Sequence, residues 1–524
     1  MYKRALVCFI ICIVLFFVTI MRVATISTTD YSKVSTTQNG IRLKIGNSRG
    51  TIYDYKGTRL TNCEEKIIAC VSPTPRAITA ISKVLKSEAL NSVLERLKSG
   101  KPILCEVPKK IECDGIVCTT VFTDADTPSR HIIGYIDSDL KGVSGIEKAY
   151  DNILYCENDV SIFYSTDAKG RILEGIEPEL LNPNHSLSHS VTTTLDINIQ
   201  NIAEKYSKSL EKGAIIVADA KNGKIRACVS RPDFDRNNID IYLQSENAPL
   251  FNRAINAYNV GSVFKPCVAA VGIENRLGGY AYTCTGSCEI IDRFFKCHKL
   301  SGHGTMDLNS GLAHSCNTFF YNLAFNIGGE KIFNLAKKLS FGQSFKICDG
   351  ISTVAGSLPK KDDLQNIAYL ANFSIGQGEL LLSPISILTL YCAIATDGQY
   401  YLPSIIEETN RNGNIQKYNI GAPTKAFESE TAKILRGYLE SVLNEGTGVA
   451  AKPQSVSAAG KTATAQTGKF RNGVEICEGW FCGFFPAEKP QYVVVVFSED
   501  DKKQDITCGE IFKGIADDIT ALGY

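Results

Sequence analysis

The signal that decides the fold lies in one short stretch, Gly261-Ser262-Val263-Phe264-Lys265. The apolar run Val268-Ala269-Ala270-Val271 follows it, so we predict that Ser262 opens a buried helix. Lys265, three residues later, then lies on the same helix face, one turn from the serine. The helix dipole favours negative charge developing on the serine oxygen, and burial can keep the lysine neutral enough to act as a base. This combination indicates a serine nucleophile paired with a lysine base.

Two other serine and lysine pairs have the same spacing, Ser209 with Lys212 and Ser357 with Lys360. The first pair lies at the polar end of a predicted helix. The second pair has Pro359 between its members, which disfavours a continuous helix. We therefore predict that both pairs belong to the solvated surface.

Two further motifs follow in sequence order, Ser315-Cys316-Asn317 and Lys461-Thr462-Ala463-Thr464. Together with the first stretch they supply a nucleophile, a second hydroxyl beside an amide, and a second lysine. Matches to three such motifs in this order are poorly explained by chance. They predict one active site built from three distant segments.

The second half of the chain alternates strand-like and helix-like segments. An Asn-Gly turn lies between two apolar runs and predicts a β-hairpin, and Asp196 is placed to cap an amphipathic helix. The predicted elements are strands 191–195, 213–219, 225–229, 478–485 and 492–497, and helices 196–212 and 508–522. We expect a mixed α/β (α+β) fold in which helices flank an antiparallel sheet.

The N-terminus carries a membrane signal. Lys3 and Arg4 precede an apolar run from Ala5 to Met21, which Arg22 closes. A cleaved signal peptide is the alternative, but no small-x-small cleavage site follows the run, so we predict an uncleaved transmembrane anchor. The positive N-terminal side should stay in the cytoplasm, which places the rest of the chain outside the cell membrane as a single-pass protein.

Changes in the residue pattern along the chain predict three regions. Residues 1–22 form the cytoplasmic tip and anchor, and residues 23–190 form a strand-rich pedestal with few long helices. Residues 191–524 form the domain that carries all three motifs.

The charge balance argues against a polyanionic partner. The chain has 56 Lys+Arg against 55 Asp+Glu, a formal net charge of +1. No basic block stands out, so we predict that nucleic acid is not a ligand.

The sequence resembles the class B penicillin-binding proteins over nearly its full length. Arg49-Gly50-Thr51-Ile52-Tyr53-Asp54 is similar to the opening motif of that family's N-terminal module. The further matching segments are Arg130–Tyr135, Gly142–Glu147, Asn252-Arg253-Ala254, Gly302-His303-Gly304, Gly376-Gln377-Gly378, Ser383-Pro384, Gly446-Thr447-Gly448 and Trp480–Phe484. The resemblance implies a pedestal followed by a penicillin-recognising serine transpeptidase domain.

The resemblance also implies a reaction, peptidoglycan D,D-transpeptidation with covalent inhibition by β-lactams. Ser262 would attack the penultimate D-Ala carbonyl of a stem peptide, with Lys265 as its base. Ser315 would relay a proton to the leaving amine, and Lys461 would shape the electrostatic potential at that hydroxyl.

Substrate contacts are implied in the same way. Asn317 would position the peptide amide, and the hydroxyls of Thr462 and Thr464 would hold the terminal carboxylate. Backbone N–H groups of Ser262 and Thr464 would form the oxyanion hole. No cofactor is expected.

Two positions depart from the family pattern. Ala463 stands where glycine is commonest, and Val260 stands where proline often precedes Gly-Ser. Neither change removes a reacting group, so they bear on substrate fit and β-lactam affinity. The competing functions are a β-lactam sensor or hydrolase of the same fold, and a non-catalytic cell-wall scaffold. A hydrolase would need its own base for deacylation, and no segment between Ser315 and Lys461 resembles one.

The 19 cysteines are unusual for an exported protein. Most are interpreted as small buried apolar residues. A zinc site could be considered at Cys284, Cys288, Cys297, His298 and His303, but the spacing is not a pair of Cys-x-x-Cys knuckles. We predict a Cys284–Cys297 disulfide or simple packing, and no metal. We also interpret His314 as a packing residue at a helix end and Cys316 as a core residue.

Outside the serine site, the chain offers no paired carboxylates of the kind expected for glycosyl chemistry. We therefore expect a separate membrane glycosyltransferase as a partner, with residues 23–190 as its docking surface. The alternative is that residues 23–190 only lift the active site to the depth of the wall.

Overall fold

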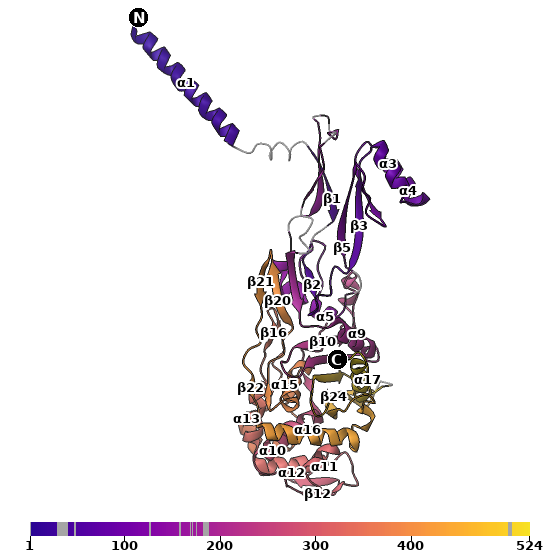
Figure 1. Cartoon of the computed structure of the whole chain (residues 1–524). Helices are drawn as coiled ribbons and strands as arrows, with labels where there is room; N and C mark the ends of the chain where they lie inside the picture. Colours follow the sequence, from indigo (N-terminus) through magenta and orange to yellow (C-terminus); the bar gives the residue numbers. More distant parts are fainter. Residues whose placement is uncertain are drawn as a thin grey trace. The chain divides into compact units, whose positions relative to one another are not determined.

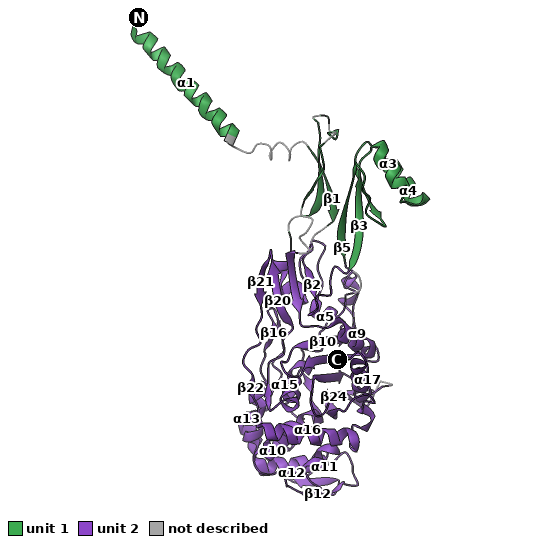
Figure 2. Cartoon of the chain, viewed as in Figure 1, with its two compact units in different colours: residues 1–48, 64–123, 156–186 green, residues 49–63, 124–155, 187–524 purple. Residues whose placement is uncertain are grey.

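The computed structural model describes residues 2–28, 40–46, 49–124, 127–156, 159–167, 169, 171–173, 176–181, 188–500 and 506–523. The chain folds into two compact units (Figure 2). The first unit comprises residues 1–48, 64–123 and 156–186, and the second comprises residues 49–63, 124–155 and 187–524.

Helix α1 (Tyr2–Thr28) contains the predicted apolar run. Among the described residues, its segment from Tyr2 to Ser27 is the one helix long and apolar enough to cross a membrane. None of this segment is buried against the rest of the protein. Its exposed apolar side chains suit a lipid environment.

The first unit holds two antiparallel sheets. In one, β3 (Glu64–Val71) lies between β4 (Ile103–Val107) and β5 (Ile116–Thr123). Apolar side chains of α3 (Pro75–Ser82) and α4 (Ser87–Leu97) form a small core with this sheet. In the other sheet, β6 (Val160–Ser165) lies between β1 (Gly40–Gly46) and β7 (Glu179–Leu181). The expected strand-rich character is present, and the two helices are an addition to it.

A five-stranded sheet forms the centre of the second unit (Figure 1). Its order is β10 (Ile225–Arg231), β9 (Gly213–Asp219), β25 (Tyr492–Ser498), β24 (Val474–Phe485) and β23 (Ala459–Arg471), with every pair antiparallel. The hairpin predicted from strands 213–219 and 225–229 thus pairs directly with the predicted C-terminal strands. The run of valines in β25 is buried on both faces, which is expected for a central strand covered by helices on each side.

Successive side chains of β24 point to opposite faces of the central sheet and show what covers each face. Phe481 and Phe485 contact Phe512 of α17 (Cys508–Ala521), with ring centroids 4.5 and 6.1 Å apart. Trp480 has the opposite orientation, and its indole N–H donates to the Asn259 carbonyl at 2.8 Å. The sheet therefore separates the C-terminal helix from the segment that leads to Ser262.

Several helices gather at one end of the second unit (Figure 1). They are α10 (Lys265–Glu274), α11 (Leu308–Ala313), α12 (Asn317–Ile327), α13 (Gly329–Lys338) and α16 (Ser429–Asn444). The other helices of this unit are α5 (Arg130–Ile133), α6 (Gly145–Ala149), α7 (Asp151–Leu154), α9 (Ile197–Ser207), α14 (Ile367–Ser374) and α15 (Pro384–Ala395). Helix α9 begins at the predicted cap, where Asp196 accepts from the Asn198 N–H, but it ends at Ser207 rather than Lys212.

Smaller strands complete the second unit. A four-stranded sheet has the order β2 (Thr51–Tyr53), β8 (His189–Thr193), β20 (Ile406–Arg411) and β21 (Asn414–Lys417). One two-stranded ladder pairs β12 (Tyr282–Cys284) with β15 (Gly304–Met306). The other two-stranded ladders are β11 (Tyr258–Asn259) with β18 (Leu381–Leu382), β13 (Ser287–Ile290) with β14 (Arg293–Lys296), β16 (Lys346–Cys348) with β17 (Ile351–Ser352), and β19 (Gln399–Tyr400) with β22 (Thr424–Lys425).

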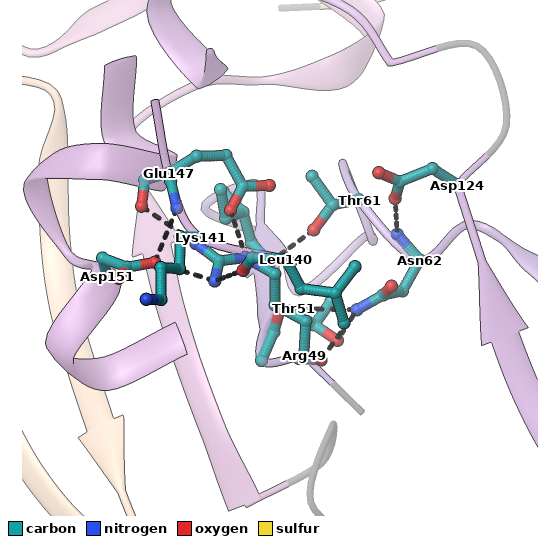
Figure 3. Close-up of polar contacts among 12 residues, drawn as sticks. Arg49, Thr51, Thr61, Asn62, Asp124, Leu140, Lys141, Glu147 and Asp151 are labelled. Atoms are coloured by element: carbon teal, nitrogen blue, oxygen red, sulfur yellow. Dashed lines mark hydrogen bonds and ion pairs between the residues drawn. The ribbon is translucent and has the colours of Figure 1, made fainter. Parts of the chain in front are cut away.

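Two N-terminal segments belong to the second unit although they precede residue 190. Arg49 Nε donates to Glu147 Oε2 at 2.7 Å, and its terminal nitrogens reach the carbonyls of Leu140 and Glu147 and the carboxylate of Asp151 (Figure 3). The second Glu147 oxygen pairs with Arg236 at 3.1 Å. The division into compact units therefore differs from the expected boundary at residue 190, because these ion pairs tie residues 49–63 and 124–155 to the C-terminal half.

Candidate active site

A tight turn presents Ser262. The short 3-10 helix η2 (Gly261–Phe264) leads into α10, of which nearly every residue is buried. Gly261 has φ +61°, and its N–H donates to the Gly376 carbonyl at 2.8 Å. Gly376 has φ +76°, and a Cβ there would lie 2.0 Å from the Gly261 oxygen. The two backbones can approach this closely only because residue 376 is a glycine. Ser262 itself stays half-buried at the mouth of the turn.

Lys265 is fully buried, one turn after Ser262. Its Nζ donates to the Ser315 carbonyl at 2.7 Å, to Ser315 Oγ at 3.2 Å and to Asn317 Oδ1 at 2.7 Å. The Phe320 ring lies 5.4 Å away. Desolvation lowers the pKa of Lys265 to about 7, against a smaller opposing effect of the Cys316 and Cys297 thiols. A neutral amine is therefore accessible near pH 7, which a base requires.

Ser315 and Asn317 occupy the turn between α11 and α12. Ser315 is buried and has φ +54°, an uncommon backbone conformation for a serine. His314 directly follows α11 as its C-cap, as predicted for a residue at a helix end. The turn directs Ser315 and Asn317 to the same lysine, so the first two motifs converge.

Strand β23 carries the third motif. Lys461 is fully buried, and its Nζ donates to the Thr462 carbonyl at 3.0 Å. Desolvation, with a smaller contribution from the charge of Lys265, lowers the pKa of Lys461 well below its usual value. Because the charge of Lys265 affects the pKa of Lys461, the two amines lie in one electrostatic environment.

Strand β23 lies directly against the Ser262 turn. A Cβ on Gly261 would stand 3.1 Å from the Ala465 Cβ and 3.4 Å from the Ala463 Cβ. A cavity of about 260 Å³ borders the same strand. Its lining includes Thr447, Thr462, Ala463, Thr464 and Trp480. Thr462 Oγ1 is hydrogen-bonded to Thr447 Oγ1 at 2.8 Å, whereas Thr464 is exposed.

The competing serine and lysine pairs lack this environment. Lys360 is exposed and Lys212 is half-exposed. Ser357 Oγ donates to the Glu379 carbonyl instead of approaching a lysine. Their assignment to the surface agrees with the structure.

The sequence did not predict the positioning role of Asn259, Glu478 and Trp480. The Asn259 N–H donates to Glu478 Oε2 at 2.7 Å, and its carbonyl accepts from Trp480. Both contacts come from β24 and hold the strand that leads into the Ser262 turn. Burial raises the pKa of Glu478 to about 7. A glutamate inside an apolar strand run was a sequence signal for this role, because an unpaired buried carboxylate is costly.

Cys284 and Cys297 do not form a disulfide. Of the two alternatives expected for this pair, the disulfide is therefore wrong. Instead, both sulfurs lie near His303 Nδ1, at 3.6 and 3.5 Å.

Comparisons with known proteins agree with this site. The family model "Penicillin binding protein transpeptidase domain" matches residues 213–518, which is more than half of the chain. The chain belongs to the family of penicillin-binding protein transpeptidases, and the predicted class B membership and fold are confirmed.

Curated relatives extend the similarity beyond that domain. Stage V sporulation protein D of Bacillus subtilis is 28% identical over 494 residues, covering 87% of this chain and 74% of that protein. Peptidoglycan D,D-transpeptidase MrdA of Escherichia coli is 23% identical over 536 residues, covering 87% of this chain and 81% of that protein.

A solved structure shares the fold. Penicillin binding protein 3 from Mycobacterium tuberculosis, complexed with aztreonam, has a TM-score of 0.66 at 21% identity. The match covers 91% of this chain and 96% of that one.

Proposed function

We propose that this protein is a membrane-anchored peptidoglycan D,D-transpeptidase that works through an acyl-enzyme on Ser262. The observation that carries the proposal is the buried Lys265 amine, which contacts Ser315 and Asn317 one helical turn from Ser262. Family membership and relatives named as D,D-transpeptidases support the reaction class.

The reaction proceeds in two acyl transfers. Ser262 Oγ attacks the penultimate D-Ala carbonyl of a stem peptide while the neutral Lys265 amine accepts its proton. The tetrahedral intermediate collapses, the terminal D-Ala leaves as an amine after receiving a proton through Ser315, and the acyl group remains on Ser262. An amine of a second stem peptide then attacks the ester, forming the cross-link and returning the proton to Ser262. A β-lactam follows the first step, but its leaving amine stays tethered to the acyl group.

Binding groups surround this path. Asn317 holds the peptide amide. Burial lowers the pKa of Lys461, but a substrate carboxylate nearby favours the charged form of this amine, which then attracts the carboxylate. Thr462 and Thr464, on the cavity beside β23, bind that carboxylate through their hydroxyls. The N–H groups of Ser262 and Thr464 stabilise the oxyanion. Ala463 narrows the space next to Gly261, which we expect to weaken binding of bulky β-lactams.

Fluorescent penicillin tests the nucleophile. The full chain in detergent should be labelled, and mass spectrometry of the digested protein should locate the adduct on Ser262. Ser262→Ala should lose the label, while Ser209→Ala and Ser357→Ala keep it. Label on another residue would contradict the assignment. An adduct that turns over rapidly would favour a β-lactam hydrolase, and an unlabelled but folded chain would favour a scaffold.

We also propose the membrane topology. Lys3 and Arg4 hold the N-terminus in the cytoplasm. Helix α1 then anchors the second compact unit, which carries Ser262 and is called the catalytic unit below, outside the membrane. Protease added to intact spheroplasts should digest the catalytic unit and spare an N-terminal tag. Protection of the catalytic unit would contradict this orientation.

A membrane glycosyltransferase is the proposed partner, docked on the pedestal. Anchoring both enzymes in one membrane raises their effective concentration. The test should spare residues 49–63 and 124–155, because their ion pairs belong to the catalytic unit. Replacing only residues 64–123 with an inert linker should abolish crosslinked copurification of the polymerase while penicillin labelling persists. Unchanged copurification and growth would mean that the pedestal is only a stalk.

A further inference from the structure

A buried tyrosine contacts the backbone of the nucleophile turn, the 3-10 helix η2. Tyr391 lies on α15, a helix whose 12 residues are all buried. Its hydroxyl donates to the Val263 carbonyl at 3.0 Å, and both residues are fully buried. Burial raises the pKa of Tyr391 well above its usual value, so the hydroxyl keeps its proton and acts as a donor. The two acyl transfers do not use this hydroxyl.

The Val263 carbonyl lacks the donor that its own turn would offer. In a 3-10 helix each carbonyl accepts from the N–H three residues later, and the Ser262 carbonyl accepts from the Lys265 N–H in this way. The Val263 carbonyl would need the N–H of residue 266, which is a proline and has none. An unpaired carbonyl inside the core is costly, and the Tyr391 hydroxyl supplies the donor.

The 3-10 geometry decides how Ser262 and Lys265 face each other. With about 3.0 residues per turn, side chains three positions apart are eclipsed. With the about 3.6 residues per turn of an α-helix, the same two side chains differ by about 60° around the helix axis. A change from 3-10 to α geometry at this turn would therefore rotate the serine hydroxyl away from the lysine amine.

An α-helical turn is the alternative conformation of this segment. Helix α10 begins at Lys265, directly after η2. Its extension by one residue toward the N-terminus would bring the Cys267 N–H to the Val263 carbonyl, because α-helical bonds join residues four positions apart. The Tyr391 hydroxyl competes for that carbonyl. Pro266 acts in the same direction, since it denies the Ser262 carbonyl an α-helical donor.

We propose that Tyr391 is a positioning residue for acylation, which holds the nucleophile turn in 3-10 geometry so that Ser262 faces the Lys265 amine. The inference rests on the proposed roles of these two residues. Tyr391 acts through the Val263 backbone and not by contact with the reacting atoms. Helix α15 packs against β24 and β25, so the hydroxyl also ties the turn to the central sheet.

Stopped-flow labelling of the full chain in detergent with a fluorescent penicillin tests the role. Tyr391→Phe removes only the hydroxyl and should lower the acylation rate constant about tenfold, with less than about a twofold change in initial binding. Tyr400→Phe is the matched control, because the buried Tyr400 hydroxyl also donates to a backbone carbonyl, that of Lys338 at 2.8 Å. It should acylate as the unmodified chain does. Equal acylation rate constants in the two variants would overturn the proposal.

The pH profile separates positioning from a general loss of structure. In Tyr391→Phe the plateau of the acylation rate should fall while the inflection stays near pH 7, because the acceptors around the Lys265 amine are unchanged. A shifted inflection would mean that Tyr391 acts on the lysine pKa, and it would overturn the positioning role. A slower reaction that arises from weaker initial binding alone would overturn it too.

A crystal structure of the unmodified chain acylated by penicillin does not depend on the folding of any variant. It should keep the bond from the Lys265 N–H to the Ser262 carbonyl and the bond from Tyr391 to Val263. An α-helical bond from the Cys267 N–H to the Val263 carbonyl, with Tyr391 turned away, would overturn the proposal. An unmodified chain that takes no label would contradict the proposed function and this inference with it, whereas a labelled chain with an equally fast Tyr391→Phe variant would contradict this inference alone.

Discussion

At the scale of single residues, the two lysines of the site differ in what surrounds them. The Lys265 amine faces three oxygen acceptors from Ser315 and Asn317, so its position is fixed by geometry. The Lys461 amine donates to the carbonyl of the next residue in its own strand. Both are fully buried, yet only Lys265 lies one turn from Ser262. Lys265 is thus the better base. Lys461 becomes a source of positive charge when a substrate carboxylate favours its protonated form.

This difference predicts unequal effects of arginine. Lys265→Arg should reduce the acylation rate at least about a thousandfold, because a guanidinium cannot be deprotonated to act as a base. Lys461→Arg should retain part of the rate, since a fixed positive charge still serves there. Stopped-flow labelling with a fluorescent penicillin measures both. The opposite ranking would mean that the two roles are exchanged.

The pH dependence follows from the lowered pKa of Lys265. Its pKa of about 7 means that the neutral amine dominates above pH 7 rather than only above the usual 10.5. The acylation rate should therefore rise about tenfold per pH unit below 7 and level off above it. The charged or titratable groups around Lys265 are Lys461, Cys316 and Cys297. A rate that is constant from pH 5 to 8 would contradict a lysine base.

At the scale of elements, local patterns predicted strands and helices well but not their partners. The hairpin 213–231, the C-terminal strands and helix α17 agree with the sequence prediction, because alternation and capping are local signals. The helix from Asp196 was predicted too long by five residues, since it ends at Ser207. The role of Glu478 was missed because its partner, Asn259, is a distant residue on another strand.

Glu478 gives a prediction about the element before Ser262. Glu478→Ala should lower the acylation rate of the bound β-lactam about tenfold and change its initial binding little, since it removes the acceptor of the half-buried Asn259 N–H. Glu478→Gln keeps an acceptor oxygen and should restore most of the rate. The dependence of the labelling rate on β-lactam concentration separates the acylation rate constant from the initial binding constant. Glu475→Ala, three residues earlier on β24, is the control and should behave as the unmodified chain. A glutamine variant as slow as the alanine variant would show that the negative charge matters instead.

At the scale of the whole molecule, the chain enters the catalytic unit three times. Residues 49–63 and 124–155 join residues 187–524, while the intervening segments form the other unit. Sequence texture changed near residue 190, so a single boundary there was the natural prediction. The residue pattern could not reveal the buried ion-pair network of Arg49, Glu147 and Arg236. Charged residues in a sequence usually predict positions on the protein surface. Through this network, the N-terminal motifs contribute to the stability of the catalytic unit.

Removing Glu147 should therefore destabilise the catalytic unit. Glu147→Ala removes the nearly buried counter-charge that Arg49 and Arg236 share. Because Arg49 keeps Asp151 and Arg236 keeps Asp124, we expect a cost of about 3 kcal/mol, the lower end of the range for a broken buried pair. Trp480 is the only tryptophan of the chain and lies in the central sheet, so its fluorescence reports unfolding of this unit alone. The urea midpoint of the detergent-solubilised chain should fall clearly. Glu330→Ala removes an exposed partner of Lys361 in the same unit and should leave the midpoint unchanged. Equal midpoints for the two variants would mean that the N-terminal motifs do not hold the catalytic unit together.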